Sequence, residues 1–492
     1  MKIIANTLVR PAALAAALLC AALTAQAATI VVTSRDPAGV GFNDPTPVAP
    51  VGGNPGTTLG EQRLNVYKKV ASLWEAAVQS NVTITVNAGW EALSCNATSA
   101  VLGSASSWNF WHDFPGAVPG TWYPQALANK IAGSNQSANQ ADDGTGYGNV
   151  DIKTQFNVNL GNIGCLDNTP FYLGLDGNAG AKVNFMTTLL HEIGHGLGFS
   201  IGTTSSSSGR RYLADGSAYA PATGNDGLPS IWETYMYDGT LGTTWLNTTS
   251  PAQRVTSSTN TGKLAWNGPL TVAGAAQTLS NTPSVSISTP AQQLPSLFAF
   301  GTASFGPAVS LPMNLGKVAD TASEACNALP ANSFRGKVAM VNRGTCSFVI
   351  KSKVAQDAGA IGVIVVNNAA GAAPGMSGVD ATVVIPTVSV SQADGASLRA
   401  MVAAAAKYGT RSTPGVVNAS LAYDTSKKAG ADAAGRPLLY APNPFVGGSS
   451  VSHYDVSAFP NLLMEPNINA DLTNSLVPPL DLTLPLLKDI GW

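Results

Sequence analysis

TTLLHEIGHGLGFS, residues 187–200, places two histidines, His191 and His195, four positions apart. On an α-helix, residues at this spacing project from one face, about one turn from each other. Four apolar side chains fall on roughly the opposite side of the same helix: Met186, Leu189, Ile193 and Leu197. The stretch therefore predicts a half-buried helix on which two imidazoles lie close enough to bind one metal ion.

Glu192 directly follows the first histidine and points to one flank of the pair. A carboxylate in that place can accept a proton from metal-bound water without occupying a coordination position. Imidazole nitrogens suit zinc, and a catalytic zinc site combines three protein ligands with a water whose pKa reaches about 7. The HExxH pattern of residues 191–195 thus predicts a zinc hydrolase with Glu192 as general base, and a third ligand elsewhere in the chain.

The pattern extends to HExxHxxG at Gly198, and this resembles the signature of the metzincin metallopeptidases. In that family the glycine turns the chain and a third histidine follows three residues later, but Ile201 occupies that position. In the leishmanolysin-like branch, an insertion follows the glycine and the third ligand comes from farther along the chain. The chain has four histidines, so His112 and His453 remain as candidates.

His453 is followed eleven residues later by Met464, and then by the apolar C-terminal segment DLTLPLLKDIGW. This order resembles the end of leishmanolysin-like enzymes, in which a distant histidine completes the zinc site. A methionine turn then packs beneath the metal, and a C-terminal helix closes the fold. The resemblance implies His453 as the third zinc ligand, beside His191 and His195, and Met464 as the turn.

Two other residues are candidates for the third zinc ligand. His112 lies between aromatic residues in WNFWHDF, a context that suits packing or substrate contact better than metal binding. Glu233, in IWETYMYD, could complete the site as a carboxylate does in gluzincins, but no methionine turn accompanies it. Glu233 is therefore the alternative ligand.

Near residue 294 the pattern changes to alternating strands and helices. Two strands and two helices are expected in the order β-α-β-α, at residues 334–344, 347–360, 361–368 and 391–406. The segment resembles the protease-associated (PA) domain at Gly336 to Gly344, at Cys346 and at Val363 to Asn368. In its family this domain accompanies secreted peptidases and sorting receptors, covers or recognises substrates, and is not catalytic. Another α/β binding domain is the alternative.

These patterns predict an α+β protein in which a metzincin-like zinc peptidase domain, with a twisted sheet and an active-site helix, is interrupted by an α/β PA domain. The expected segments are a signal peptide (1–27), the first part of the peptidase (28–284), the insertion (285–420) and the C-terminal part with the third ligand (421–492). The two ends of the insertion should lie close together.

Three further elements are expected in the first part of the peptidase. Residues 61–80 should form an amphipathic helix, and residues 81–86 and 149–158 should form strands. Because sheet edges commonly bind extended peptides, we expect substrate to pair with the strand at 149–158.

The N-terminus has the pattern of an export signal. Lys2 and Arg10 precede an apolar run at residues 12–23, and a small-x-small cleavage site ends at Ala27. The run is shorter than the roughly 20 residues that span a bilayer, so a secreted or periplasmic chain without a membrane span is expected.

Removal of the signal leaves four cysteines in a chain bound for an oxidising compartment. Three pairings are possible. The domain boundary between Cys165 and Cys326 favours Cys95 with Cys165 and Cys326 with Cys346.

Charge limits the possible partners, because the net charge is −2 and only 11% of residues are charged, so neither nucleic acid nor an anionic membrane is indicated. We expect a secreted zinc endopeptidase that acts on proteins or peptides. The competing class is a non-catalytic secreted binding protein that uses the PA-like domain, and the presence of Glu192 argues against it.

Overall fold

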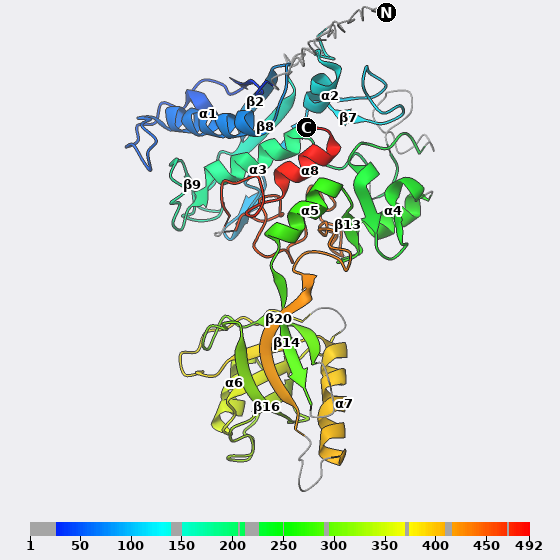
Figure 1. The fold of residues 1–492 in the computed structure, drawn as a ribbon. Helices are drawn as coiled ribbons and strands as arrows, with labels where there is room; N and C mark the ends of the chain where they lie inside the picture. The colour runs from blue at the N-terminus through cyan, green and yellow to red at the C-terminus, as the bar shows by residue number, and fades with distance from the viewer. Residues whose placement is uncertain are drawn as a thin grey trace, which may run out of the picture.

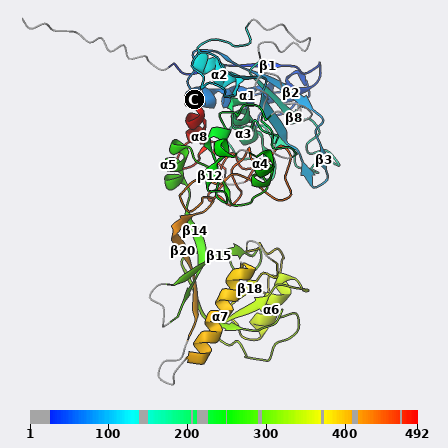
Figure 2. The ribbon, with the colours of Figure 1, turned by 90° about the vertical axis from the view of Figure 1, so that its right-hand side faces the viewer.

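The computed structural model describes residues 26–138, 150–204, 207–211, 226–248, 250–289, 295–369, 373–408, 416–469 and 472–492. The expected signal peptide lies outside these residues, apart from its last two positions. The described chain forms two bodies, and the strands β14 (Asn281–Ser288) and β20 (Asn418–Lys428) run between them (Figures 1 and 2). Within the described residues, no helix is both long and apolar enough to cross a membrane.

The first body is built on a four-stranded sheet with the order β1-β2-β8-β5. Its strands are β1 (Ile30–Ser34), β2 (Ile84–Glu91), β8 (Ile152–Asn157) and β5 (Gly103–Ser107). The first three are parallel, and β5 is antiparallel to β8 at the edge of the sheet. The expectation that substrate pairs with residues 149–158 is therefore wrong, because β8 has a strand on each side.

Three helices pack around this sheet. α1 (Leu59–Ala77) begins with a capping box between Thr58 and Glu61, and it contacts β1 and α3. α3 (Phe185–Leu197) packs against β5 and β8, and α8 (Thr483–Ile490) lies near it at the C-terminus (Figure 1). The prediction of a half-buried α3 is wrong, because every one of its residues is buried.

The remaining elements of this body are short. Its helices are α2 (Gln125–Ala132), α4 (Pro251–Ser257), α5 (Pro269–Thr278) and the 3-10 turns at Gly41–Asn43, Glu233–Tyr235 and Trp245–Asn247. Its strands are β3 (Cys95–Asn96), β4 (Ser99–Ala100), β6 (Phe110–Trp111), β7 (Tyr123–Pro124), β9 (Phe171–Tyr172), β10 (Val183–Asn184), β11 (Met236–Asp238), β12 (Thr243–Thr244) and β13 (Leu264–Trp266).

The second body is a closed barrel with the strand order β14-β15-β19-β18-β17-β16-β20. Between β14 and β20 it contains β15 (Ser296–Thr302), β16 (Met313–Asp320), β17 (Val338–Asn342), β18 (Gly362–Val366) and β19 (Thr387–Val390). Helices α6 (Phe348–Asp357) and α7 (Gln392–Tyr408) lie outside it (Figures 1 and 2). The strands and helices expected between residues 334 and 406 form where the sequence indicates.

The two ends of the barrel segment lie side by side. β14 pairs with β20 in antiparallel register, with Asn281 opposite Lys428, and the Ala429 N–H donates to the carbonyl of Ser280 at 2.9 Å. The expectation that the ends are adjacent is confirmed. The first body can therefore continue from α5 to residue 429 as though the barrel were a long loop.

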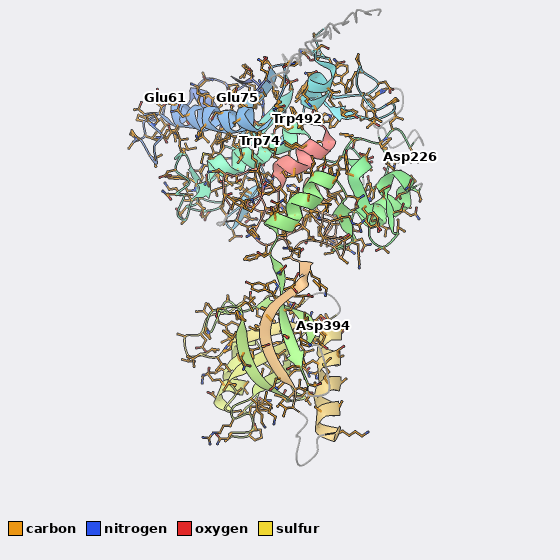
Figure 3. The ribbon with its side chains drawn as sticks, viewed as in Figure 1. Glu61, Trp74, Glu75, Asp226, Asp394 and Trp492 are labelled. Carbon is orange, nitrogen blue, oxygen red and sulfur yellow. A yellow bond between two sulfur atoms is a disulfide. The ribbon has the colours of Figure 1, made fainter. Side chains whose placement is uncertain are left out.

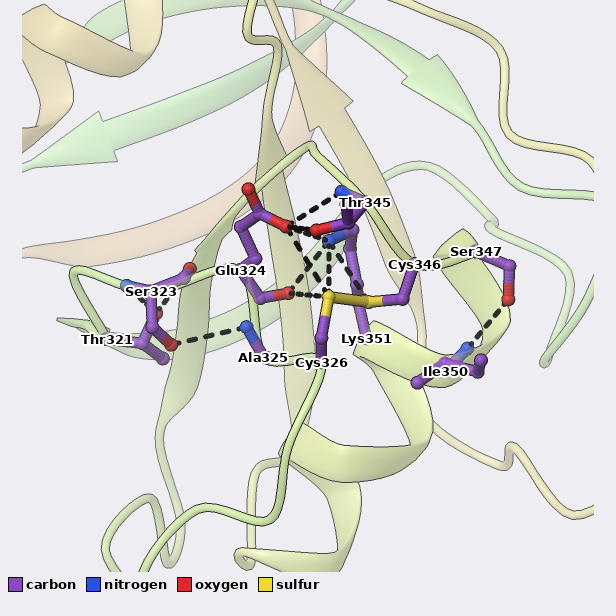
Figure 4. The surroundings of a disulfide bond; sticks show 10 residues. All are labelled: Thr321, Ser323, Glu324, Ala325, Cys326, Thr345, Cys346, Ser347, Ile350 and Lys351. Carbon is purple, nitrogen blue, oxygen red and sulfur yellow. Dashed lines mark hydrogen bonds and ion pairs between the residues drawn. A yellow bond between two sulfur atoms is a disulfide. The ribbon is translucent and has the colours of Figure 1, made fainter.

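Both expected disulfides form. Cys95 is bonded to Cys165, and Cys326 is bonded to Cys346. The second bond lies at the start of α6 beside Lys351, whose fully buried ammonium donates to the carbonyl of Glu324 at 2.9 Å (Figure 4). The Glu324 carboxylate in turn accepts from the N–H of Thr345 at 2.7 Å. The disulfide thus ties the loop before β17 to the segment that leads into α6.

Gly196 lets α3 approach the sheet. A Cβ at this position would lie 3.0 Å from both Cγ1 and Cδ1 of Ile152 on β8, and it would overlap Cγ2. Glycine in a helix normally costs about 1 kcal/mol relative to alanine, so replacement would stabilise a helix with free space there. At Gly196 the added methyl group would instead destabilise the fold, because it would overpack the contact with Ile152.

We predict that Gly196→Ala lowers the free energy of unfolding by about 1–3 kcal/mol, as overpacked cores do. Urea denaturation of the variant measures this change. Combining it with Ile152→Ala, which removes the obstructing atoms, should cost less than the sum of the two single changes. Strict additivity would show that the contact between α3 and β8 is not the cause.

Candidate active site

Three buried histidines from distant parts of the chain meet at one point. His191 and His195 come from α3, and His453 comes from the C-terminal part of the chain. The Nε2 atom of His195 lies 3.1 Å from that of His191 and 3.1 Å from that of His453, and the third side of the triangle is 3.3 Å. In the described chain, these three residues form the one group of potential metal ligands.

A backbone carbonyl holds the other ring nitrogen of each histidine. The Nδ1 atoms of His191, His195 and His453 lie 2.7, 2.6 and 2.7 Å from the carbonyl oxygens of Leu463, Phe199 and Ser449. Because a carbonyl only accepts hydrogen bonds, each Nδ1 carries the proton and each Nε2 presents a lone pair. Metal-binding histidines usually donate their other ring N–H to a carbonyl or carboxylate in this way.

The triangle of lone pairs fits a zinc ion. Imidazole nitrogens at 2.0–2.1 Å from a tetrahedral zinc lie about 3.3 Å from one another, close to the spacing of these Nε2 atoms. Burial lowers the pKa of His191 to about 4, and burial together with the neighbouring His191 imidazole lowers that of His195 to about 3. The pKa of His453 is also held well below its usual range by burial and by the other two imidazoles. All three are therefore neutral at pH 7, as ligation requires.

Glu192 lies beside the triangle and is 7% exposed. Burial raises the pKa of its carboxyl to about 8, and a backbone hydrogen bond from Ala105 on β5 partly opposes this shift. A carboxylate with a raised pKa is suited to take up a proton and release it again. The edge strand and the acid/base candidate are thus in direct contact.

Met464 packs against the turn of α3 that separates the two helical histidines. It is fully buried, and a Cβ built on Gly194 would lie 3.0 Å from its sulfur. Trp74 of α1 lies near the same position of Gly194, and the indole of Trp492 donates to the carbonyl of Leu197 at 2.7 Å (Figure 3). The histidine helix is therefore fixed from several directions.

The two rejected or alternative ligands lie elsewhere. His112 bonds the carboxylate of Asp113 at 2.6 Å, and its ring centroid packs 4.3 Å from that of Trp122. Glu233 is fully buried, pairs with Arg211 at 3.4 Å and accepts from the hydroxyl of Thr203. Neither belongs to the histidine group, so the structure does not support Glu233 as a substitute for His453.

Sequence reasoning missed Asp481. This residue is 2% exposed, and its carboxylate accepts from the N–H groups of Leu463 and Thr483, each at 2.7 Å. The Leu463 carbonyl binds Nδ1 of His191, so Leu463 connects Asp481 to the imidazole through its N–H on one side and its carbonyl on the other. An aspartate just before the apolar run 482–490 resembles a helix N-cap in sequence, but its second partner, Leu463, cannot be read from local spacing.

A cleft of about 810 Å³ opens over the histidines and Glu192. Its walls are residues 103–106 of β5 with residues 100–102 before them, Ser200, Ile201, Thr203, Thr204 and Ser207 after α3, and parts of segments 445–453 and 466–468. Ile201, the position of the third ligand in short metzincins, lies in this wall and donates its N–H to Ser452 at 3.2 Å, next to His453.

Comparison with known proteins identifies one part of the chain. Residues 305–398 match the model of the PA domain family. The predicted PA module is therefore confirmed for these residues, and they lie within the barrel.

Several curated proteins share a short region with this chain. Leucine aminopeptidase 2 of Trichophyton rubrum is 48% identical over 81 residues, which is 16% of each chain. The PII-type proteinase of Lactococcus lactis subsp. cremoris is 39% identical over 92 residues, 19% of this chain and 4% of that protein. The chain thus spans about one sixth of the length of the fungal relatives.

Solved structures resemble the chain weakly. A zinc aminopeptidase from Bacillus subtilis is 17% identical and has a TM-score of 0.20, over 32% of this chain and 36% of that one. An aminopeptidase from an Aneurinibacillus species is 14% identical with a TM-score of 0.20, over 39% and 42%.

We predict that His453→Ala abolishes stoichiometric zinc binding, because two imidazoles remain where three converge. Glu233→Ala should retain zinc, because Glu233 is committed to Arg211 and Thr203. Metal analysis of both purified variants measures the difference. Loss of zinc from Glu233→Ala alone would reverse the assignment of the third ligand.

A second prediction concerns Asp481. Asp481→Asn should weaken zinc binding by about 10-fold or more, because an amide oxygen holds the Leu463 peptide less firmly than a carboxylate, and second-shell changes typically cost 10–100-fold in affinity. Competition with a chromophoric chelator measures the dissociation constant. An unchanged constant in a folded variant would show that the turn holds His191 without Asp481.

Proposed function

We propose that this chain is an exported, zinc-dependent endopeptidase of the leishmanolysin-like metzincin type, with a PA domain inserted between its second and third zinc ligands. One observation carries the proposal: three neutral, buried imidazoles direct their lone pairs to one point beside the carboxyl of Glu192. The short regions shared with named peptidases agree with a peptidase but do not include enough of either chain to assign one.

Zinc bound by His191, His195 and His453 would act as a Lewis acid toward the scissile carbonyl and would lower the pKa of water. Glu192 acts as general base toward the attacking water and then returns the proton to the leaving amine. Burial raises the pKa of the Glu192 carboxyl, so it holds a transferred proton well, and a bound cation nearby would favour the ionised form that accepts the proton. The Ala105 N–H positions the carboxyl for this work.

The substrate is held along β5. This strand pairs with β8 on one side, and residues 100–106 line the cleft on the other. An extended peptide can add to such an edge through main-chain hydrogen bonds. We therefore propose that the substrate pairs with β5 and not with the strand at 149–158.

Two details favour the metzincin type over the alternatives. The fully buried Met464 lies beneath the histidine helix, next to Gly194, and the third imidazole comes from beyond the insertion. A purely structural zinc site normally closes with four protein ligands, whereas three histidines converge in the described residues. A catalytic site is therefore favoured over a non-catalytic binding protein with a structural metal.

The proposal keeps the domain division expected from the sequence. Residues 1–27 are removed on export, and the peptidase comprises residues 28–284 and 421–492. The strands of the inserted barrel extend a few residues beyond 285–420, from Asn281 to Lys428.

We predict that Glu192→Gln slows casein hydrolysis by at least about 100-fold, the usual contribution of a general base, and leaves zinc content unchanged. A chelator should abolish hydrolysis by the parent chain, and added zinc should restore it. Quenched fluorescent casein measures each rate. Hydrolysis that survives both the substitution and the chelator would refute the mechanism.

A further inference from the structure

We propose that the cleft selects internal peptide bonds flanked by uncharged side chains, and that it excludes free chain ends. This inference rests on the proposed function, because it concerns the substrate of that same site. It is drawn from the chemistry of the walls and from the length of the edge strand.

The described walls of the cleft are almost entirely uncharged. Of the 26 residues that line it, 22 have no ionisable side chain, and the remaining four are Glu192 and the three histidines. Ten of the neutral residues are serines or threonines, among them Ser104 and Ser106 on β5 and Ser449 and Ser450 before His453. Ile201, Phe445 and Ile468 add apolar surface.

Such walls penalise ionised groups. Away from Glu192, a charged side chain that enters the cleft exchanges water for neighbours that offer dipoles but no opposite charge, and this exchange is unfavourable. Glutamine, serine and threonine side chains can instead bond the wall hydroxyls, and aliphatic or aromatic side chains can pack on the apolar residues. The preference therefore follows charge rather than size.

The described walls also offer no charged group that would bind the terminal ammonium or carboxylate of a substrate, apart from Glu192. Removal of an N-terminal residue requires an acidic group for the substrate ammonium, and removal of a C-terminal residue requires a cation for the carboxylate. Glu192 is the one carboxylate in the described lining, and the mechanism uses it as the base. Arg211 follows the wall residues Thr203, Thr204 and Ser207 in the chain, but it is buried and paired with Glu233.

The wall formed by β5 is long enough to bind an extended segment of a polypeptide substrate. Residues 103–106 of β5 line the cleft, residues 100–102 continue that wall before the strand, and an extended strand rises about 3.3 Å per residue. A substrate segment of about four residues can therefore pair along β5, with the histidines and Glu192 lining the same cleft. Binding of that length favours a bond inside a polypeptide over one at its end.

The test uses the purified mature chain with zinc and a set of internally quenched peptides with acetylated and amidated ends. In otherwise identical peptides, the residues on each side of the cleaved bond are Leu, Gln or Ser, or else Lys or Asp. We expect kcat/KM to be at least about 10-fold lower for Lys and Asp than for the uncharged residues. Leucine p-nitroanilide, which has a free ammonium, should not be hydrolysed.

A matched pair of variants tests the role of the wall. Ser104 is exposed on β5 and faces Gln155 across the strand pair, so a change there leaves the histidines and Glu192 in place. Ser104→Asp should raise kcat/KM for the Lys peptides at least about 5-fold relative to Ser104→Asn.

The outcomes separate the two proposals. Cleavage of Lys, Asp and uncharged peptides at equal rates, or release of terminal residues only, would overturn the inference and leave a zinc peptidase in place. Failure to cleave any peptide in the zinc-loaded chain would overturn the proposed function, and the inference with it.

Discussion

The structure depends on bringing three imidazole lone pairs to within 3.3 Å of one another in a buried site. Lone pairs that face each other repel, and burial holds the pKa of each ring too low for a proton to relieve that repulsion at neutral pH. A cation is the physical solution to this arrangement. The carbonyls on Nδ1, the packing of Met464 and the carboxylate of Asp481 all restrain the rings in the orientation that a cation requires.

The three histidines meet although His453 is far from the other two in the sequence. A whole barrel separates His195 from His453, and the closure of the barrel through β14 and β20 returns the chain to where it left the first body. Bringing together the two ends of a long segment costs entropy, but this cost grows only slowly with the length of the segment. The insertion can therefore be large without displacing His453, and the first body keeps a single core that includes α1, α3, Met464 and α8.

Much of this arrangement could be predicted from local patterns, and the rest could not. The helical spacing of His191 and His195 and the strands and helices of the barrel carry strong local signals, and the cysteine pairing followed from the domain boundary between Cys165 and Cys326. Placing His453 beside them required a family resemblance, because no local pattern encodes a contact between residues 258 positions apart. β5 was missed because GSASS lacks the alternation of a half-buried strand, and β8 was mistaken for an edge because strand order is a tertiary property. The ion pair between Glu233 and Arg211 could not be predicted either, because it too depends on the tertiary fold.

X-ray absorption at the zinc edge of the purified mature chain tests the central claim most directly, because it reports the number and type of atoms bound to the metal. The account predicts three imidazole nitrogens at about 2.0–2.1 Å and one light oxygen ligand, with no sulfur. A sulfur shell near 2.3 Å, or only two imidazoles with additional carboxylate oxygen, would contradict it.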